Sequence, residues 1–183
     1  GSVRRLTLGV PMLANCVAVT LAFGASQACA ADFLVANEAQ LRAALNPSGG
    51  AQNGDRIVLT SNVALSSDLP MVQRSVTIEG GGNTLSGNST YRGLLVQSGT
   101  VAVSNLTIAD TKAQGGAGGA GGGGGAGLGG ALFVTSGAGV TVTNVAIQNS
   151  AATGGAGGAN LTNLNTGGGG GGGMGGDGGG TVS

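Results

Sequence analysis

Short runs that alternate apolar with small polar residues occupy the chain from Asp55 onward, and each run is bounded by Gly, Asn or Ser. A period of two is typical of β-strands with one buried face. No run exceeds about five residues before a bend is expected. We predict strands at RIVLT (56–60), NVALS (62–66), SVTIEG (75–80), GLLVQ (93–97), TVAVSNLTI (100–108), ALFVT (131–135) and VTVTNVAIQ (140–148).

Ahead of these runs, the pattern changes to a helical one over roughly 37–45. Asn37 is a suitable N-cap and Glu38 suits the first turn. An apolar face is formed by Leu41, Ala44 and Leu45. Asn46-Pro47, followed by Ser-Gly-Gly, ends the pattern. Because a helix this short is marginal alone, we expect it to cap another structure.

The strand runs repeat. Three of them align as Val76-x-Ile78-x-Gly80, Val101-x-Val103-x-Asn105 and Val140-x-Val142-x-Asn144. Val101 follows Val76 by 25 residues, whereas Val140 follows Val101 by 39. The second interval contains GGAGGAGGGGGAGLGG (115–130), and removing most of this tract returns the spacing to about 25. The glycine tract is therefore predicted to be an insertion between two copies of one unit.

A unit of about 25 residues with several short strands fits one coil of a parallel β-solenoid, in which apolar residues of successive coils stack into columns. Asn105 and Asn144 then lie at a bend, where Asn tolerates a left-handed backbone and its amide can bond to the next coil. Gly80 occupies the same place with the same backbone freedom. We predict a turn ladder at Gly80, Asn105 and Asn144; the alternative is that they are ordinary turn formers.

The segments ANEAQLRAAL, GDRIVLT, SVTIEGGGNTLSG and VTVTNVAIQNS resemble the N-terminal part of bacterial autotransporter passenger domains, and the wider pectate-lyase-like right-handed β-helix superfamily. The resemblance covers roughly 32–153. It implies an all-β fold, a right-handed parallel β-helix (solenoid) with a short N-terminal helical cap and glycine-rich loop insertions. In autotransporters a signal peptide precedes the passenger and an outer-membrane β-barrel follows it. No barrel-type strand run is present here, and we expect that part to be missing.

The first 30 residues have the layout of a secretory signal peptide: basic Arg4 and Arg5, an apolar run, and the small residues Ala28 and Ala30 before a cleavage point. The apolar run is also long enough to be interpreted as a membrane anchor. We expect cleavage and export. The predicted division is signal peptide 1–30, cap 31–54, β-helix coils 55–153 with a glycine-rich insertion at 113–130, and a glycine-rich low-complexity segment 154–183.

Composition excludes several function classes. Seven basic residues balance seven acidic ones and His is absent, so nucleic acid is not an expected partner. The acidic residues of the mature chain are scattered, and no acid/base pair is forced together. The stretch Gly172–Asp177 matches the start of a Ca²⁺-binding nonapeptide, but a tract so rich in glycine matches by chance. We therefore assign no catalytic, cofactor-binding or metal-binding residue.

These observations predict a fragment of an exported bacterial surface protein, the passenger of an autotransporter acting as an adhesin or cell-surface interaction scaffold. Its partners would be host or neighbouring-cell surface components or polysaccharide, and its membrane contacts only the signal peptide and the absent barrel. The alternative is a secreted β-helix polysaccharide lyase or hydrolase with catalytic coils beyond residue 183. A third hypothesis is a structural surface protein. Residues from about 154 lack a core, and we expect disorder or packing against other glycine tracts.

Overall fold

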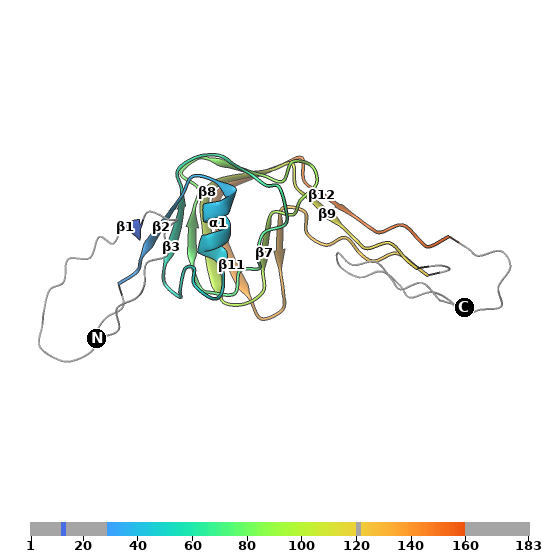
Figure 1. Cartoon of the computed structure of the whole chain (residues 1–183), viewed down its shortest axis with the longest axis horizontal. Helices are drawn as coiled ribbons and strands as arrows, with labels where there is room; N and C mark the ends of the chain where they lie inside the picture. Colours follow the sequence, from blue (N-terminus) through green and yellow to red (C-terminus); the bar gives the residue numbers. More distant parts are fainter. Residues whose placement is uncertain (1–11, 14–28, 120–121, 160–183) are drawn as a thin grey trace, which may run out of the picture.

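The computed structural model describes residues 12–13, 29–119 and 122–159. This part of the chain is mostly β-structure with one helix (Figure 1). Its strand pairs are parallel, apart from the antiparallel pair of β1 with β2. The helix is α1 (Glu38–Leu45). The strands are β1 (Met12–Leu13), β2 (Asp32–Val35), β3 (Arg56–Leu59), β4 (Val63–Ala64), β5 (Thr77–Glu79), β6 (Thr84–Ser86), β7 (Leu94–Val96), β8 (Thr100–Ala109), β9 (Lys112–Gln114), β10 (Leu132–Val134), β11 (Gly139–Gln148) and β12 (Ala151–Thr153).

Strands far apart in sequence pair in parallel and in register. The largest sheet includes β2, β3, β5 and β8 in that order, and β11 pairs with the opposite edge of β8. Ile57 is opposite Ile78, Ile78 is opposite Val103, and Val103 is opposite Val142. The last two pairs confirm the predicted alignment of the repeats. We call each set of strands at one level of this stack a layer.

The core consists of aliphatic side chains that lie above one another in successive layers. Strands β3, β5, β7 and β8 contribute alternate residues to it, as the period of two predicts. Fully buried members include Val35, Ile57, Leu65, Ile78, Leu85, Val96, Val101, Val103, Leu106 and Ile108. The columns are open at β11, where Ile147 is 56% exposed although its register partner Ile108 is 1% exposed.

Helix α1 follows β2 and contributes to the same core. Leu41, Ala44 and Leu45 are buried in the main apolar cluster, and the Asn37 side chain accepts a hydrogen bond from the Gln40 N–H at 3.0 Å. The predicted helix, its N-cap and its apolar face are confirmed. In Figure 1 the helix lies against the strand stack. Among the described residues, no helix is long and apolar enough to cross a membrane.

The glycine-rich segments leave the strand stack side by side. Figure 1 shows residues 115–119, 122–130 and 154–159 extending away from the strands as an arm. Lys112–Gln114 form β9, which pairs with β12, and Ala113 is buried. The first two residues of the predicted insertion at 113–130 are therefore part of β9. Most of the predicted signal segment and all of residues 160–183 lie outside the described residues.

Candidate functional site

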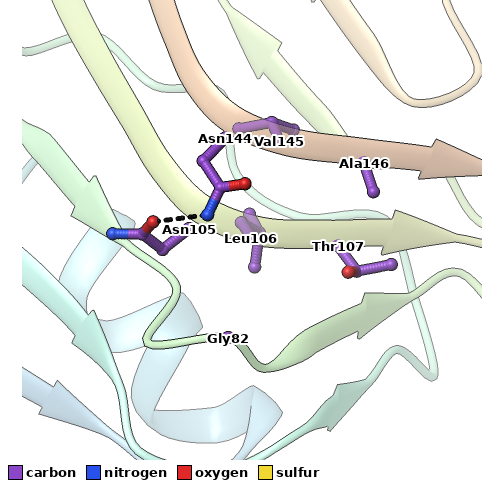
Figure 2. A pocket seen from close by; sticks show the side chains of 7 residues that line it. All are labelled: Gly82, Asn105, Leu106, Thr107, Asn144, Val145 and Ala146. Atoms are coloured by element: carbon purple, nitrogen blue, oxygen red, sulfur yellow. Dashed lines mark hydrogen bonds between the residues drawn. The ribbon is translucent and has the colours of Figure 1, made fainter.

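Asn105 and Asn144 lie above one another at the bends of β8 and β11. Both have a left-handed backbone, with φ of 49° and 51°. The Asn144 Nδ2 donates a hydrogen bond to the Asn105 Oδ1 at 2.8 Å, drawn as the dashed line in Figure 2. Asn adopts this backbone more readily than other residues with a side chain, which explains why it recurs at this phase of the repeat. The bends divide each long strand into two shorter ones.

Glu79 begins this ladder one layer earlier. Its Oε1 accepts hydrogen bonds from the Asn105 Nδ2 and the Gly81 N–H, both at 3.0 Å, and its Oε2 accepts one from the Ser104 Oγ at 2.6 Å. The pKa of the Glu79 carboxyl is lowered most by the hydrogen bond from Ser104, and less by those from Asn105 and Gly81. The carboxylate thereby orients the Asn105 amide, whose oxygen is left to accept from Asn144.

Gly80 occupies the predicted register position but plays a different part. The left-handed backbone at this bend belongs to Gly81 and Gly82, with φ of 59° and 79°. A Cβ on Gly80 would lie under 3.0 Å from the backbone of Asn105 and Leu106 in the next layer. Gly80 is therefore required by the close approach of two layers, and not by its backbone angle as we predicted.

A second ladder follows the same two strands. Asp110 and Asn149 are also left-handed, and the Asn149 Nδ2 donates to the Asp110 Oδ1 at 3.2 Å. Beside them, the Thr111 Oγ1 donates to the Ser150 Oγ at 2.7 Å, and Thr111 is buried. The prediction missed this ladder. Extending the alignment at the same 39-residue offset from Asn105 and Asn144 to residues 110–111 and 149–150 pairs Asp-Thr with Asn-Ser and would have found it.

A pocket of about 220 Å³ lies beside the Asn ladder, at the open end of the stack. It is lined by Gly82, Asn105, Leu106, Thr107, Asn144, Val145 and Ala146 (Figure 2). No acidic or basic side chain is among these residues. Small-molecule sites usually combine an apolar lining with several convergent polar groups. This pocket offers only the ladder amides and a hydroxyl, so it has little means of orienting a ligand or performing acid–base chemistry.

Glu38 joins α1 to the turn after β4. Its Oε2 accepts hydrogen bonds from the Ser66 N–H at 2.9 Å and the Ser66 Oγ at 2.6 Å, and its Oε1 pairs with the Arg42 Nε at 2.9 Å. Arg42 continues to the Ser67 hydroxyl and the Asp68 carbonyl. Partial burial raises the pKa of Glu38, but the bonds from Ser66 and Arg42 outweigh it and lower the pKa to about 2. This carboxylate has a structural role.

The glycine arm consists of three segments, 115–119, 122–130 and 153–159, and each contacts both others. Hydrogen bonds run from the Gly118 N–H to the Ala156 carbonyl at 2.8 Å and from the Gly125 N–H to the Gly116 carbonyl at 2.7 Å. The Gly155 N–H completes the triangle by donating to the Gly125 carbonyl at 2.7 Å. The arm is therefore a three-segment bundle held by backbone groups.

Glycines that contact a neighbouring backbone recur every third residue in the arm. A Cβ at any of them would lie under 3.0 Å from a main-chain atom of another segment or of β12: Gly115, Gly118, Gly124, Gly127, Gly130, Gly155 and Gly158. Those of the first segment face the second, those of the second face the third or β12, and those of the third face the first. A three-residue spacing is that of an extended helix with three residues per turn. The third segment thus packs on other glycine tracts through Gly158.

Ala28 lies outside the described residues, and Ala30 is exposed just before β2. In the described ranges, no group of three or more His, Cys, Asp and Glu side chains could hold a metal ion. No protein family, curated protein or solved structure matches the chain.

Proposed function

We propose that the layers are successive coils of a right-handed parallel β-helix and that the chain is part of an exported bacterial surface protein. The observation that carries this proposal is the in-register stack from β2 through β3, β5 and β8 to β11. The offset of 25 residues between β5 and β8 is the length of one coil. The bends at Asn105 and Asn144 supply the corners.

The biochemical role we propose is that of an autotransporter passenger acting as an adhesin or interaction scaffold. A stack of coils offers a long, rigid surface, which suits binding to an extended partner such as a cell-surface component or a polysaccharide. The two acidic residues with lowered pKa values, Glu38 and Glu79, are both engaged in contacts between layers or with the helix cap. Their use as structural anchors favours binding over acid–base catalysis.

Export is tested by expressing the chain in a Gram-negative host and measuring the mass and location of the product. We expect a periplasmic or surface product that begins at Ala31. Retention of the uncleaved chain in the cytoplasm would overturn the export proposal.

Binding is tested with the labelled chain 31–183 on intact bacterial cells, epithelial cells and immobilised polysaccharides. We expect saturable binding that is lost in the unfolded protein. Release of new reducing or unsaturated sugar ends would overturn the non-catalytic role. Absence of binding to every surface would count against an adhesin.

A further inference from the structure

Among the carboxylates of the described residues, Asp55 differs from the others because it is buried, with 8% of its surface exposed. Its Oδ1 accepts a hydrogen bond from the Ala31 N–H at 2.9 Å, and its Oδ2 accepts one from the Gln52 N–H at 2.7 Å. The ion pairs of the described residues are formed by Glu38 and Asp32 instead. A buried carboxylate is costly unless it is hydrogen-bonded and, preferably, paired with a positive charge.

Ala31 is the residue that would become the N-terminus of the exported chain. Its side chain is buried, whereas Cys29 and Ala30 before it are exposed. Its carbonyl accepts a hydrogen bond from the Arg56 N–H at 2.8 Å, which fixes the residue at the start of β2. The bond from its N–H to Asp55 and the bond from Arg56 to its carbonyl together hold the Ala31 nitrogen next to Asp55.

We propose that Asp55 is a binding site for the N-terminal ammonium group that signal-peptide cleavage creates at Ala31. The inference rests on the proposed export. A signal peptidase adds water across the Ala30–Ala31 peptide bond. The hydroxyl goes to the Ala30 carbonyl carbon and leaves a carboxylate on the released peptide. The Ala31 nitrogen gains a hydrogen and is protonated at neutral pH. The ammonium replaces the amide N–H as donor to the Asp55 Oδ1.

The consequence is that the first layer distinguishes the processed chain from one with any residue before Ala31. Both chains can form a hydrogen bond to Asp55, but only the processed chain places a positive charge there. The other charged groups next to Ala31 are Asp32 and Arg56, and they pair with each other through two hydrogen bonds of 3.1 and 2.8 Å. Asp55 is thus the counter-ion that the new terminus meets.

The sign of the pH dependence follows from the pairing. An α-amino group has an ordinary pKa of about 7.7–8.0, and pairing with a buried carboxylate raises the pKa of the Ala31 amine. The ion pair therefore stabilises the processed chain fully below about pH 8. This stabilisation is lost as the pH rises through the raised pKa.

A double-mutant cycle tests the pair. Four proteins are compared: the chains 31–183 and 30–183, each with Asp55 or with Asp55→Asn. Chemical unfolding is measured at pH 6.5 and pH 10. At pH 6.5 we expect Asp55→Asn to lower the folding equilibrium constant about tenfold more in 31–183 than in 30–183. The excess should disappear at pH 10. Equal losses in the two chains at pH 6.5 would overturn the proposal.

A second measurement does not depend on the variants folding. The rate of reductive methylation of the Ala31 amine in 31–183 is followed against pH and located by mass spectrometry. Protection of the amine and a raised pKa support the pair, and an ordinary pKa overturns it. N-terminal mapping of the exported chain separates the two proposals. Cleavage elsewhere removes the role in maturation, while the cycle on 31–183 still decides whether Asp55 binds the ammonium.

Discussion

The strand stack and the glycine arm hold their segments together by opposite means. In the stack, Ile78, Val103 and their neighbours form a core of aliphatic side chains that are almost fully buried. In the arm, the segments approach so closely that a methyl group at Gly118 or Gly155 would overlap another backbone. The stack therefore depends on the hydrophobic effect, whereas the arm depends on backbone hydrogen bonds and on the absence of side chains.

This difference predicts that the two regions differ in stability. Burial of aliphatic side chains contributes about 1.5–3 kcal/mol for each one removed from water. Each backbone hydrogen bond contributes only about 0.5–1.5 kcal/mol net, and ordering a glycine has a large entropic cost. We therefore expect the arm to open locally at a lower free energy than the stack unfolds.

The largest effect should come from a truncation inside the stack. We expect Ile108→Ala to lower the free energy of unfolding by about 2–5 kcal/mol, because the side chain is 1% exposed and a cavity would remain. Its register partner, Ile147, is 56% exposed and provides the matched control. Ile147→Ala should cost less than about 1 kcal/mol. Urea unfolding followed by circular dichroism measures both losses. Equal losses would show that β11 does not lie at the open end of the core.

The next effect concerns the attachment of the helix to the stack. The pKa of Glu38 is lowered from 4.5 to about 2, so its contribution is present above pH 4.5 and is lost as the pH falls towards 2. Glu38→Gln should cost about 1–3 kcal/mol at pH 7 and should flatten the decline in stability between pH 4.5 and 2. Asp32→Asn, which removes an exposed ion pair, is the control and should cost less than about 1 kcal/mol. An unchanged acid slope in Glu38→Gln would contradict the assignment.

A smaller effect should separate the two roles of the Asn ladder. Asn144→Ala loses the amide and places Ala, which adopts a left-handed backbone less readily than Asn, at φ of 51°. We therefore expect a loss of about 1–3 kcal/mol. Asn144→Gly loses the amide but keeps the backbone conformation, and should cost about 0.5–1.5 kcal/mol. Thermal unfolding of both variants measures the difference. A glycine variant no more stable than the alanine variant would show that the side-chain bond dominates.

Much of the stack could be predicted because its signal is local and repeated. The strand runs, the helix after Asn37 and the 25-residue alignment all depend on the order of residue types along the chain. Strands β1, β2, β6, β9 and β12 were missed because none of them lies in an alternating run as long as those of the predicted strands, and each is fixed by its partner strand. Length alone does not decide, since β4, β5, β7 and β10 are equally short and were predicted. In β9, for example, Ala113 is buried only because β12 lies beside it.

The contacts that required the structure are those between layers. The sequence pairs Gly80 with Asn105, but it cannot distinguish a need for a left-handed backbone from a need for close approach. The link from Glu79 through Asn105 to Asn144 depends on which amide atoms face each other. Burial of Asp55 beside Ala31 depends on the pairing of β2 with β3. None of these has a periodic signal.

The smallest effect on overall stability should come from the arm, and it tests the comparison most directly. Gly127→Ala places a methyl group under 3.0 Å from the Thr153 backbone, whereas Gly123 has nothing within 4 Å of the same position. We expect Gly127→Ala to increase amide exchange at Gly115, Gly118 and Gly155 about tenfold or more, with the unfolding free energy of the stack changed by less than about 0.5 kcal/mol. Gly123→Ala should leave the exchange rates unchanged. Hydrogen exchange measured by NMR gives the exchange rates in the arm and the unfolding free energy of the stack from one sample.

Equal exchange in the two variants would mean that the three-residue spacing of crowded glycines does not hold the arm together. Loss of stack stability in Gly127→Ala alone would mean that arm and stack unfold as one unit. The two regions would then differ in the contacts that hold them together, but not in stability.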